Sequence, residues 1–312
     1  MAGAWTRAER GSYSIRYTIP DAEVTMGEVV LAAKITHVPS IWLSIHPGKH
    51  HGIRRPAELG LAEVGRRAKE RGADTFVVAD SHWMNSMSFH VNGKARHQGS
   101  YASHELPHFI RDLEYDYPGC PELAALIGEE ITAGGQKAMV HDVKDLGLEY
   151  ATLVPMHFMN RDGDPIAVVP VGCNIYSSID ENRRVGEAIA RAVLRSDRKV
   201  AFLASGSLSH QFPPNEVSSQ YLDRISNPIN EQADRLVLEQ WGSGRITEFL
   251  AALPAYNERF TGEAAMADTA MLFGILGWDA YTGHGEQLCD YFPSSGTGQV
   301  IVDFPIPDGL KA

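Results

Sequence analysis

The sequence predicts an α/β fold, with a mixed central sheet covered by helices in a single large domain and an active-site cleft at the strand ends. Short, near-continuous apolar runs alternate with amphipathic helical segments, which is typical of strands buried on both faces. Three of these runs, at 29–35, 75–80 and 200–204, are each followed shortly by a histidine. Because ligands bind at the carboxyl ends of strands in open α/β sheets, we expect the functional site there.

The composition is that of an ordinary globular protein and argues against several classes of function. Of 312 residues, 44% are hydrophobic and 21% charged, and a chain of this length buries a sizeable core. The net charge of −11 argues against nucleic-acid binding, and no run reaches the roughly 18 apolar residues of a membrane span. The 3 cysteines form no CxxC pair and no apolar signal segment is visible, which predicts reduced thiols and a cytoplasmic protein.

Residues 1–27 are polar and aperiodic, and we interpret them as an N-terminal extension to one domain over 28–312. The domain is expected to begin with the strand at 29–35, whose polar exit carries His37. A loop rich in glycine, histidine and proline follows, and then a helix over about 57–71. His37 is thus predicted to stand where a buried strand stops.

The next segments place a second histidine after a strand. The strand at 75–80 leads to His82. From 83 to 118 the sequence is rich in asparagine, glycine, histidine, tyrosine and proline, and is long enough to form a functional wall or lid rather than a plain connector. A helix over 123–133 and a short strand over 138–141 are expected after it.

The second half of the chain repeats the pattern and ends with a buried helix and a strand. A strand over 166–172 precedes a clearly amphipathic helix over 181–195. The strand at 200–204 leads to His210, the third histidine of the series. The remaining expected elements are helices at about 229–242, 246–252 and 263–276 and a strand at 300–304.

Glu263 stands at the start of the last helix, which is apolar all round. A carboxylate there favours the positive end of the helix dipole by about 0.3–1 kcal/mol, and this effect alone can explain the residue. A second interpretation arises if a cation lies nearby, because two histidines and one carboxylate on one face of a metal leave three positions open. Such a set is the facial triad of non-haem Fe(II) oxygenases, and it also suits catalytic zinc.

A rival metal motif is His104-Glu105-Leu106-Pro107-His108, which reads H-E-x-x-H. In zinc metalloproteases this motif needs both histidines one turn apart on a continuous helix. Pro107 removes a backbone donor and pushes Leu106 out of the helical conformation. We therefore do not expect His104 and His108 to bind a metal.

Eight stretches of the sequence are together typical of one family. They are LAAKITHVPS (31–40), PGKHHG (47–52), VVADSHW (77–83), ELPHFIRD (105–112), LEYATLVPM (148–156), ASGSLSH (204–210), AMADTAMLFGILGWD (265–279) and FPSSGTGQV (292–300). In these stretches the sequence resembles the class III extradiol ring-cleavage dioxygenases of the protocatechuate 4,5-dioxygenase type, and within that family it is most similar to the 3,4-dihydroxyphenylacetate (homoprotocatechuate) 2,3-dioxygenase branch. The resemblance covers about nine-tenths of the chain, from Met26 onward.

The resemblance implies an enzyme that inserts both atoms of O2, its co-substrate, into a catecholic ring, with 28–312 as its catalytic domain. The family's Fe(II) ligands fall on His37, His82 and Glu263, and its acid–base histidine on His210. His210 would take a proton from a catechol hydroxyl and return it later. We do not expect it to be a fourth ligand, because a fourth ligand would leave only two open metal positions, too few for both catechol oxygens and O2. We also expect a small aromatic substrate, a homo-oligomer, and substrate contacts from His51, His141, Tyr150 and Ser207.

The ring substituent of the substrate stays open at this point. Homoprotocatechuate, protocatechuate, 2-aminophenol, a methylated gallate and a bicyclic catechol would differ only in their pocket contacts. His104 departs from the family pattern and lies in the expected wall of the pocket. A non-redox, metal-binding relative with the same fold is the alternative from another class of function, and the complete set of three ligands plus His210 argues against it.

Overall fold

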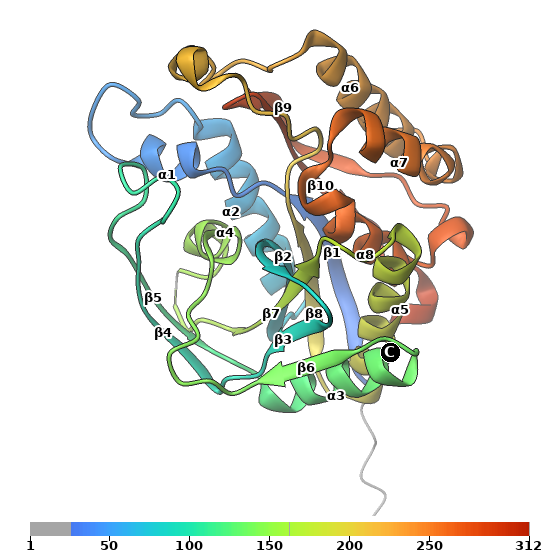
Figure 1. The fold of residues 1–312 in the computed structure, drawn as a ribbon. Helices are drawn as coiled ribbons and strands as arrows, with labels where there is room; N and C mark the ends of the chain where they lie inside the picture. The colour runs from blue at the N-terminus through green and yellow to red at the C-terminus, as the bar shows by residue number, and fades with distance from the viewer. Residues whose placement is uncertain (1–25, 162, 312) are drawn as a thin grey trace, which may run out of the picture.

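An eight-stranded mixed sheet forms the centre of the computed structural model, which describes residues 26–161 and 163–311 (Figure 1). The predicted α/β class, with a mixed sheet covered by helices, is confirmed. The predicted extension at 1–27 lies almost wholly outside the described residues. In sheet order the strands are β6 (Ala138–His141), β3 (Phe89–Asn92), β7 (Ala167–Asn174), β2 (Thr75–Asn85), β8 (Lys199–Ser205), β1 (Glu28–Ile35), β10 (Thr297–Phe304) and β9 (Glu286–Ser294).

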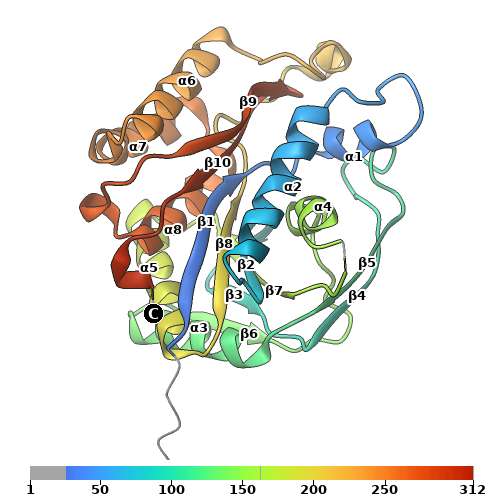
Figure 2. The ribbon, with the colours of Figure 1, turned by 180° about the vertical axis from the view of Figure 1, so that it is seen from behind.

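Three neighbouring parallel strands, β2, β8 and β1, form the middle of the sheet (Figure 2). Their pairing register aligns Val77 with Phe202 and Phe202 with Ala32, all of them fully buried. The near-continuous apolar runs that predicted these strands are therefore explained by cover on both faces. On the other side of β1, strands β10 and β9 follow in antiparallel pairs.

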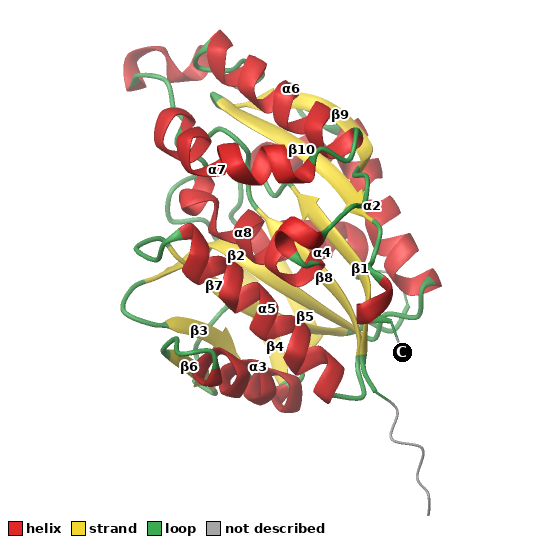
Figure 3. Ribbon diagram, turned by 90° about the vertical axis from the view of Figure 1, so that its right-hand side faces the viewer, coloured by secondary structure: helices red, strands yellow, loops and turns green. Residues whose placement is uncertain are grey.

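Helices cover both faces of the sheet, and each face has its own cluster of buried apolar side chains (Figure 3). Side chains of β1 alternate between the two clusters, with Ala32 in one and Leu31 in the other. One cluster includes residues of α1 (Pro39–Ile45), α2 (Arg55–Glu70) and α4 (Tyr150–Met159). The other includes residues of α3 (Pro121–Ala133), α5 (Ile179–Arg195), α6 (Pro228–Gly242), α7 (Ile246–Phe260) and α8 (Ala267–Leu276).

Helix α5 illustrates how the sequence fixes an element boundary. Ser178 accepts a hydrogen bond from the backbone N–H of Glu181, at 3.1 Å, and the Glu181 carboxylate accepts one from the Ser178 backbone N–H, at 2.7 Å. This capping box satisfies two helix-end donors, and the apolar stripe that follows is buried. The predicted helix over 181–195 is confirmed and begins two residues earlier.

The prediction of one long loop at 83–118 is wrong. Strand β2 continues through His82 to Asn85, β3 follows, and β4 (Arg96–Tyr101) pairs with β5 (Leu113–Pro118) in a small antiparallel sheet. These strands carry mainly polar and aromatic side chains, so they lack the apolar runs by which strands were recognised. Helices α1 and α4 and strand β9 also went unpredicted, and 3-10 turns lie at Asn215–Gln220, Glu263–Met266, Trp278–Ala280 and Asp308–Leu310.

The segment around Glu263 also differs from the prediction of a continuous helix at 263–276. The α-helix begins at Ala267, and Glu263 lies in a preceding 3-10 turn. Ala264, Ala265 and Met266 have φ angles of 46°, 57° and 60°, in the left-handed region. Non-glycine residues there cost about 1–3 kcal/mol each and persist only where the surroundings dictate them. Glu263 does not begin the helix, so a favourable interaction with the helix dipole does not explain its position.

A buried ion pair joins the strand that precedes His37 to the helix that follows Glu263. Lys34 on β1 and Asp268 on α8 have fully buried side chains, and the Lys34 ammonium donates to the Asp268 carboxylate. The two charged groups stabilise each other in a region from which water is excluded. None of the helices in the described ranges is long and apolar enough to cross a membrane.

Breaking this pair is expected to cost much of the stability of the domain. Lys34→Met leaves the Asp268 carboxylate buried without its counter-charge, which should lower the free energy of unfolding by about 3–5 kcal/mol. Urea denaturation followed by circular dichroism measures this change. The double variant Lys34→Met/Asp268→Leu removes both charges and should regain most of the loss, and a double variant as unstable as the single one would contradict the explanation.

Candidate metal centre and catalytic cavity

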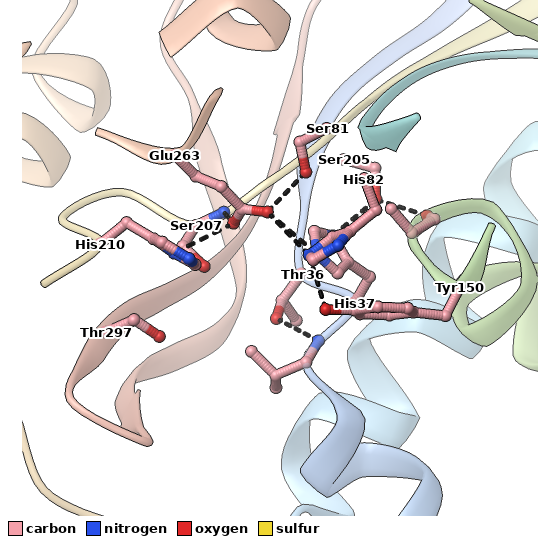
Figure 4. A network of polar contacts seen from close by, with 12 residues as sticks. Thr36, His37, Ser81, His82, Tyr150, Ser205, Ser207, His210, Glu263 and Thr297 are labelled. Atoms are coloured by element: carbon pink, nitrogen blue, oxygen red, sulfur yellow. Dashed lines mark hydrogen bonds and ion pairs between the residues drawn. The ribbon is translucent and has the colours of Figure 1, made fainter. Parts of the chain in front are cut away.

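The three parallel strands bring their carboxyl ends together at the candidate site. Ile35 of β1 and Asp80 of β2 both pair with Ser205 of β8, so these residues lie side by side across the sheet. His37 lies two residues beyond the end of β1, and His82 lies two residues further along β2, which continues to Asn85. The register of the buried sheet therefore explains why side chains so far apart in sequence converge (Figure 4).

His37, His82 and Glu263 form a group whose potential ligand atoms all lie within 4.8 Å of one another. The Nε2 atom of His37 is 3.1 Å from Glu263 Oε1, and the Nε2 atom of His82 is 3.4 Å from the same oxygen. His37 and Glu263 are buried, and His82 is partly buried. Two imidazoles and one carboxylate facing a common point fit a divalent transition metal with open positions for further ligands.

The two oxygens of Glu263 have different partners. Oε1 faces the two histidines and accepts a hydrogen bond from the Ser81 hydroxyl at 2.5 Å. Oε2 accepts one from the backbone N–H of Ser207 at 2.5 Å and lies 3.4 Å from His210 Nδ1. Burial alone would raise the pKa of Glu263, but His37 and His210 outweigh it and hold this pKa well below its usual range. The group is therefore a carboxylate at neutral pH.

His82 is oriented by contacts on both sides. Asp80 accepts hydrogen bonds from the backbone N–H of His82 at 2.9 Å and from the Thr152 hydroxyl at 2.6 Å. The Tyr150 hydroxyl lies 2.6 Å from His82 Nε2. Burial opposes the charged form of His82, yet the hydrogen bond and charge of Glu263 raise its pKa overall. The charge of Glu263 thus favours a positive charge, a proton or a metal ion, at Nε2 of His82.

His210 lies beside this group but is not part of it. Its backbone N–H donates to Thr261 O at 2.9 Å, which fixes the chain, while its buried Nδ1 has no hydrogen-bond partner among the described residues. Burial lowers the pKa of His210, although the charge of Glu263 opposes the shift. A neutral imidazole next to an open site is suited to accept a proton.

A cavity of about 270 Å³ contains all four of these residues. Its volume is near the lower end for small-molecule sites, which begin at about 300 Å³. None of its lining residues within the described chain is a lysine or an arginine. The residues lining it besides the four are Val38, Pro39, Ser81, Met84, Glu105, Leu106, Tyr150, Ser207, Phe212, Ala264, Ser294, Ser295 and Thr297.

The structure brings two of the four expected substrate-contact residues to this cavity. Tyr150 and Ser207 line it. His51 and His141 do not: His51 is exposed in the turn after α1, and His141 ends β6, with its ring 4.8 Å from that of His90. Both residues were expected to contact the substrate, whereas the fold places both outside the lining of this cavity.

The H-E-x-x-H segment is not helical, as Pro107 predicted. His104 and His108 do not line the cavity, but Glu105 and Leu106, between them, do. Sequence reasoning had placed a wall of the pocket in this region without identifying these two residues. Met84, near the end of β2, and Phe212, in a loop, were also missed, because a single exposed apolar side chain carries no pattern that distinguishes it from others.

Comparisons with known proteins agree with this geometry. The family model described as the catalytic LigB subunit of aromatic ring-opening dioxygenase matches residues 31–305. The chain is 42% identical to 3,4-dihydroxyphenylacetate 2,3-dioxygenase from Escherichia coli, over 83% of this chain and 94% of that protein. It is 24% identical to the 2-aminophenol 1,6-dioxygenase beta subunit from Pseudomonas sp, over 89% of this chain and 94% of that protein.

A solved structure, the uncharacterized protein JW3007 from Escherichia coli K12, shares the fold with a TM-score of 0.59 at 14% identity. The alignment covers 88% of this chain and 100% of that one. The family match, in turn, runs from Leu31 in β1 to Pro305, just after β10, and includes His37, His82, His210 and Glu263. The chain therefore belongs to the class III extradiol family of aromatic ring-opening dioxygenases, oxidoreductases that incorporate O2.

Proposed function

We propose that the protein is an Fe(II)-dependent extradiol dioxygenase that opens the ring of 3,4-dihydroxyphenylacetate to a muconic semialdehyde-type product. The observation that carries this proposal is that the two carboxylate oxygens of Glu263 face different histidines. One of its oxygens faces two histidines and the other faces a third histidine inside the same cavity. The substrate is proposed from the relative with 42% identity, which is a 3,4-dihydroxyphenylacetate 2,3-dioxygenase.

His37, His82 and Glu263 would hold the metal. Bound Fe(II) would supply a redox centre at which the two catechol oxygens and O2 are held together and exchange electrons. The donor set alone does not select iron over zinc, so the choice rests on the redox chemistry of the family. The protein's own contribution is to keep these donors on one side of the cavity and to leave the other side open.

His210 would move the protons of the reaction. Its neutral imidazole accepts a proton from a catechol hydroxyl, and the resulting cation is stabilised by Glu263 Oε2, 3.4 Å from Nδ1. The proton is then available for return to the ring-opening oxygen at a later stage. A group that both takes and gives a proton must stay off the metal, which agrees with its place outside the three-donor group.

Tyr150 and Ser207 are proposed to contact the substrate. Burial and the nearby Glu263 raise the pKa of Tyr150, so its hydroxyl stays protonated. This hydroxyl lies 2.6 Å from His82 Nε2 and donates to Glu105 at 3.3 Å. A metal bound at His82 Nε2 would leave the Tyr150 hydroxyl free of that nitrogen and next to the substrate oxygens.

The proposal is tested by loading the protein with Fe(II) without oxygen and then following O2 uptake with a panel of substrates. The panel includes 3,4-dihydroxyphenylacetate, protocatechuate, 2-aminophenol, methylgallate and a bicyclic catechol. We expect the highest kcat/KM with 3,4-dihydroxyphenylacetate. A higher kcat/KM with another catechol would support the proposed reaction but identify a different substrate. No uptake with any of them, or full activity with zinc alone, would overturn the proposal.

A chain of hydrogen-bonding groups, Arg54, Ser40 and Ser294, lies at one end of the cavity. It favours a substrate whose ring carries a negatively charged substituent. The buried Arg54 donates through Nε to the Ser40 hydroxyl at 2.9 Å, and Ser40 Oγ lies 2.9 Å from Ser294 Oγ. A guanidinium can only donate, so Ser40 Oγ accepts from Arg54, and we propose that the Ser40 proton goes to Ser294 Oγ and leaves the Ser294 proton for the cavity that this residue lines. Asp223 lies close enough to Arg54 to offset part of its charge.

Ser294→Ala is therefore expected to weaken binding of the acidic substrate selectively. Losing a hydrogen bond to a charged group costs about 1.5–3 kcal/mol, which corresponds to a rise in KM of about 10- to 100-fold. The measurement compares KM for 3,4-dihydroxyphenylacetate with KM for 4-methylcatechol, which has no carboxylate and should be unaffected. Equal changes for both compounds would show that Ser294 does not recognise the carboxylate.

A further inference from the structure

Ser205, the last residue of β8, makes two polar contacts, and neither of them involves an atom proposed to bind the metal or the substrate. Its side chain is fully buried. The hydroxyl donates to the backbone carbonyl of Ala151 at 2.6 Å and lies 3.0 Å from His37 Nδ1 (Figure 4). Nδ1 is the ring nitrogen of His37 that faces away from Glu263, since Nε2 is the one near the carboxylate.

The Ala151 carbonyl is free to accept this bond because of a proline in the same helix. In an α-helix the carbonyl of residue 151 would accept from the backbone N–H of residue 155. Residue 155 is Pro155, inside α4, which has no N–H and whose ring crowds the carbonyl four residues earlier. The Ser205 hydroxyl thus satisfies a buried acceptor that the helix leaves without its usual donor.

This arrangement decides which ring nitrogen of His37 carries hydrogen. A carbonyl oxygen can only accept, so the single Ser205 proton is committed to Ala151. Towards His37 the serine oxygen can then act only as an acceptor, and Nδ1 must be the donor. With hydrogen on Nδ1, the lone pair of neutral His37 lies on Nε2, 3.1 Å from Glu263 Oε1.

We infer that Ser205, oriented by the carbonyl that Pro155 frees, is a positioning residue that holds His37 in the tautomer able to bind a metal through Nε2. The inference rests on the proposed metal site, and it adds the partner that aligns one of the ligands. Such partners typically change metal affinity by about 10- to 100-fold when removed. The same helix reaches the other histidine, through Tyr150 and through Thr152 to Asp80.

The first test measures Zn²⁺ affinity by competition with a chelator, which needs neither iron, oxygen nor substrate. Ser205→Ala is expected to bind Zn²⁺ about 10- to 100-fold more weakly than the natural protein. Ser205→Thr, which keeps the hydroxyl, should recover most of the affinity. Ser44→Ala is the matched control, because Ser44 is equally buried, in α1, and its hydroxyl contacts Glu58 and the backbone N–H of Arg54 rather than a proposed metal ligand.

A second variant keeps the inference testable if Ser205→Ala does not fold. Pro155→Ala restores an N–H at residue 155 that competes for the Ala151 carbonyl, so Zn²⁺ affinity should fall while stability stays equal or rises. A merely structural role of Ser205 predicts no loss of affinity in a variant that is at least as stable. Nitrogen-15 NMR of the Zn²⁺-loaded natural protein should also find hydrogen on Nδ1 of His37 and none on Nε2.

Three outcomes would overturn the inference: unchanged Zn²⁺ affinity in Ser205→Ala, unchanged affinity in Pro155→Ala, or hydrogen on Nε2 of His37 in the Zn²⁺-loaded protein. These results are distinct from a failure of the proposed function. If the natural protein binds no divalent metal, the proposed centre itself is wrong. If it binds Zn²⁺ as expected but opens no catechol after Fe(II) loading, the positioning role of Ser205 stands and the proposed reaction does not.

Discussion

Glu263→Ala is expected to lose the metal and, with it, ring-cleavage activity to the limit of detection. The variant removes the only carboxylate of the three-donor group and leaves His37 and His82 without the negative charge they share. It also leaves the Ser81 hydroxyl and the Ser207 N–H without their acceptor. A divalent cation would then be held by two neutral imidazoles alone. Metal analysis after Fe(II) loading and gel filtration measures the loss directly.

The control for this experiment is the double variant His104→Ala/His108→Ala. Both histidines belong to the H-E-x-x-H segment, which is not helical, and neither lines the cavity. The double variant should therefore keep its full metal content, whatever its effect on substrate affinity. If this double variant lost its metal while Glu263→Ala retained it, the metal centre would have been assigned to the wrong histidines.

His210→Phe is expected to keep the metal and slow ring cleavage by about 10²- to 10⁴-fold, which is the usual contribution of a positioned acid–base group. Phenylalanine replaces the imidazole by an uncharged aromatic ring that is only slightly larger, so the cavity should still bind substrate. The measurement is single-turnover O2 consumption by variant and natural protein with equal iron content. An iron-free His210→Phe protein would show that this histidine is a ligand, and the roles given to His210 and Glu263 would then have to be exchanged.

The pH dependence of kcat/KM should distinguish the same roles. An imidazole that acts as a base is inactive once protonated, so activity falls as pH drops through its pKa. Because burial lowers the pKa of His210, this fall should occur below the ordinary value of about 6.5. The acid limb assigned to this group should vanish in His210→Phe. An unchanged limb in the variant would mean that another group controls it.

The sequence was most informative where buried parallel strands meet the site. An apolar run covered on both faces leaves a clear signal, and the first polar residues after it lie at the sheet's carboxyl edge, so His37 and His82 could be located from the pattern. The elements with polar or aromatic strands, such as β4 and β5, leave no such signal, because their pairing and not their composition makes them strands.

Other parts of the site could not be predicted because they depend on contacts between distant segments. The turn at Glu263 is not α-helical, and its carboxylate contacts His37, His82 and Ser207. No local sequence pattern predicts these contacts. Helix α4 was missed because Pro155 opposes a helix in any local reading. The proline is tolerated because the buried Ser205 hydroxyl accommodates the carbonyl that it frees.

The run of left-handed residues after Glu263 has a consequence for how this protein can be improved by engineering. Glycine at Ala264 or Ala265 adopts their φ angles, 46° and 57°, without strain, and on backbone grounds alone each replacement should raise stability by a fraction of a kcal/mol to about 1 kcal/mol. Yet glycine also widens the range of conformations open to the turn that aims the carboxylate. A search for heat-resistant variants would therefore select these changes readily, and selection for turnover would remove them again.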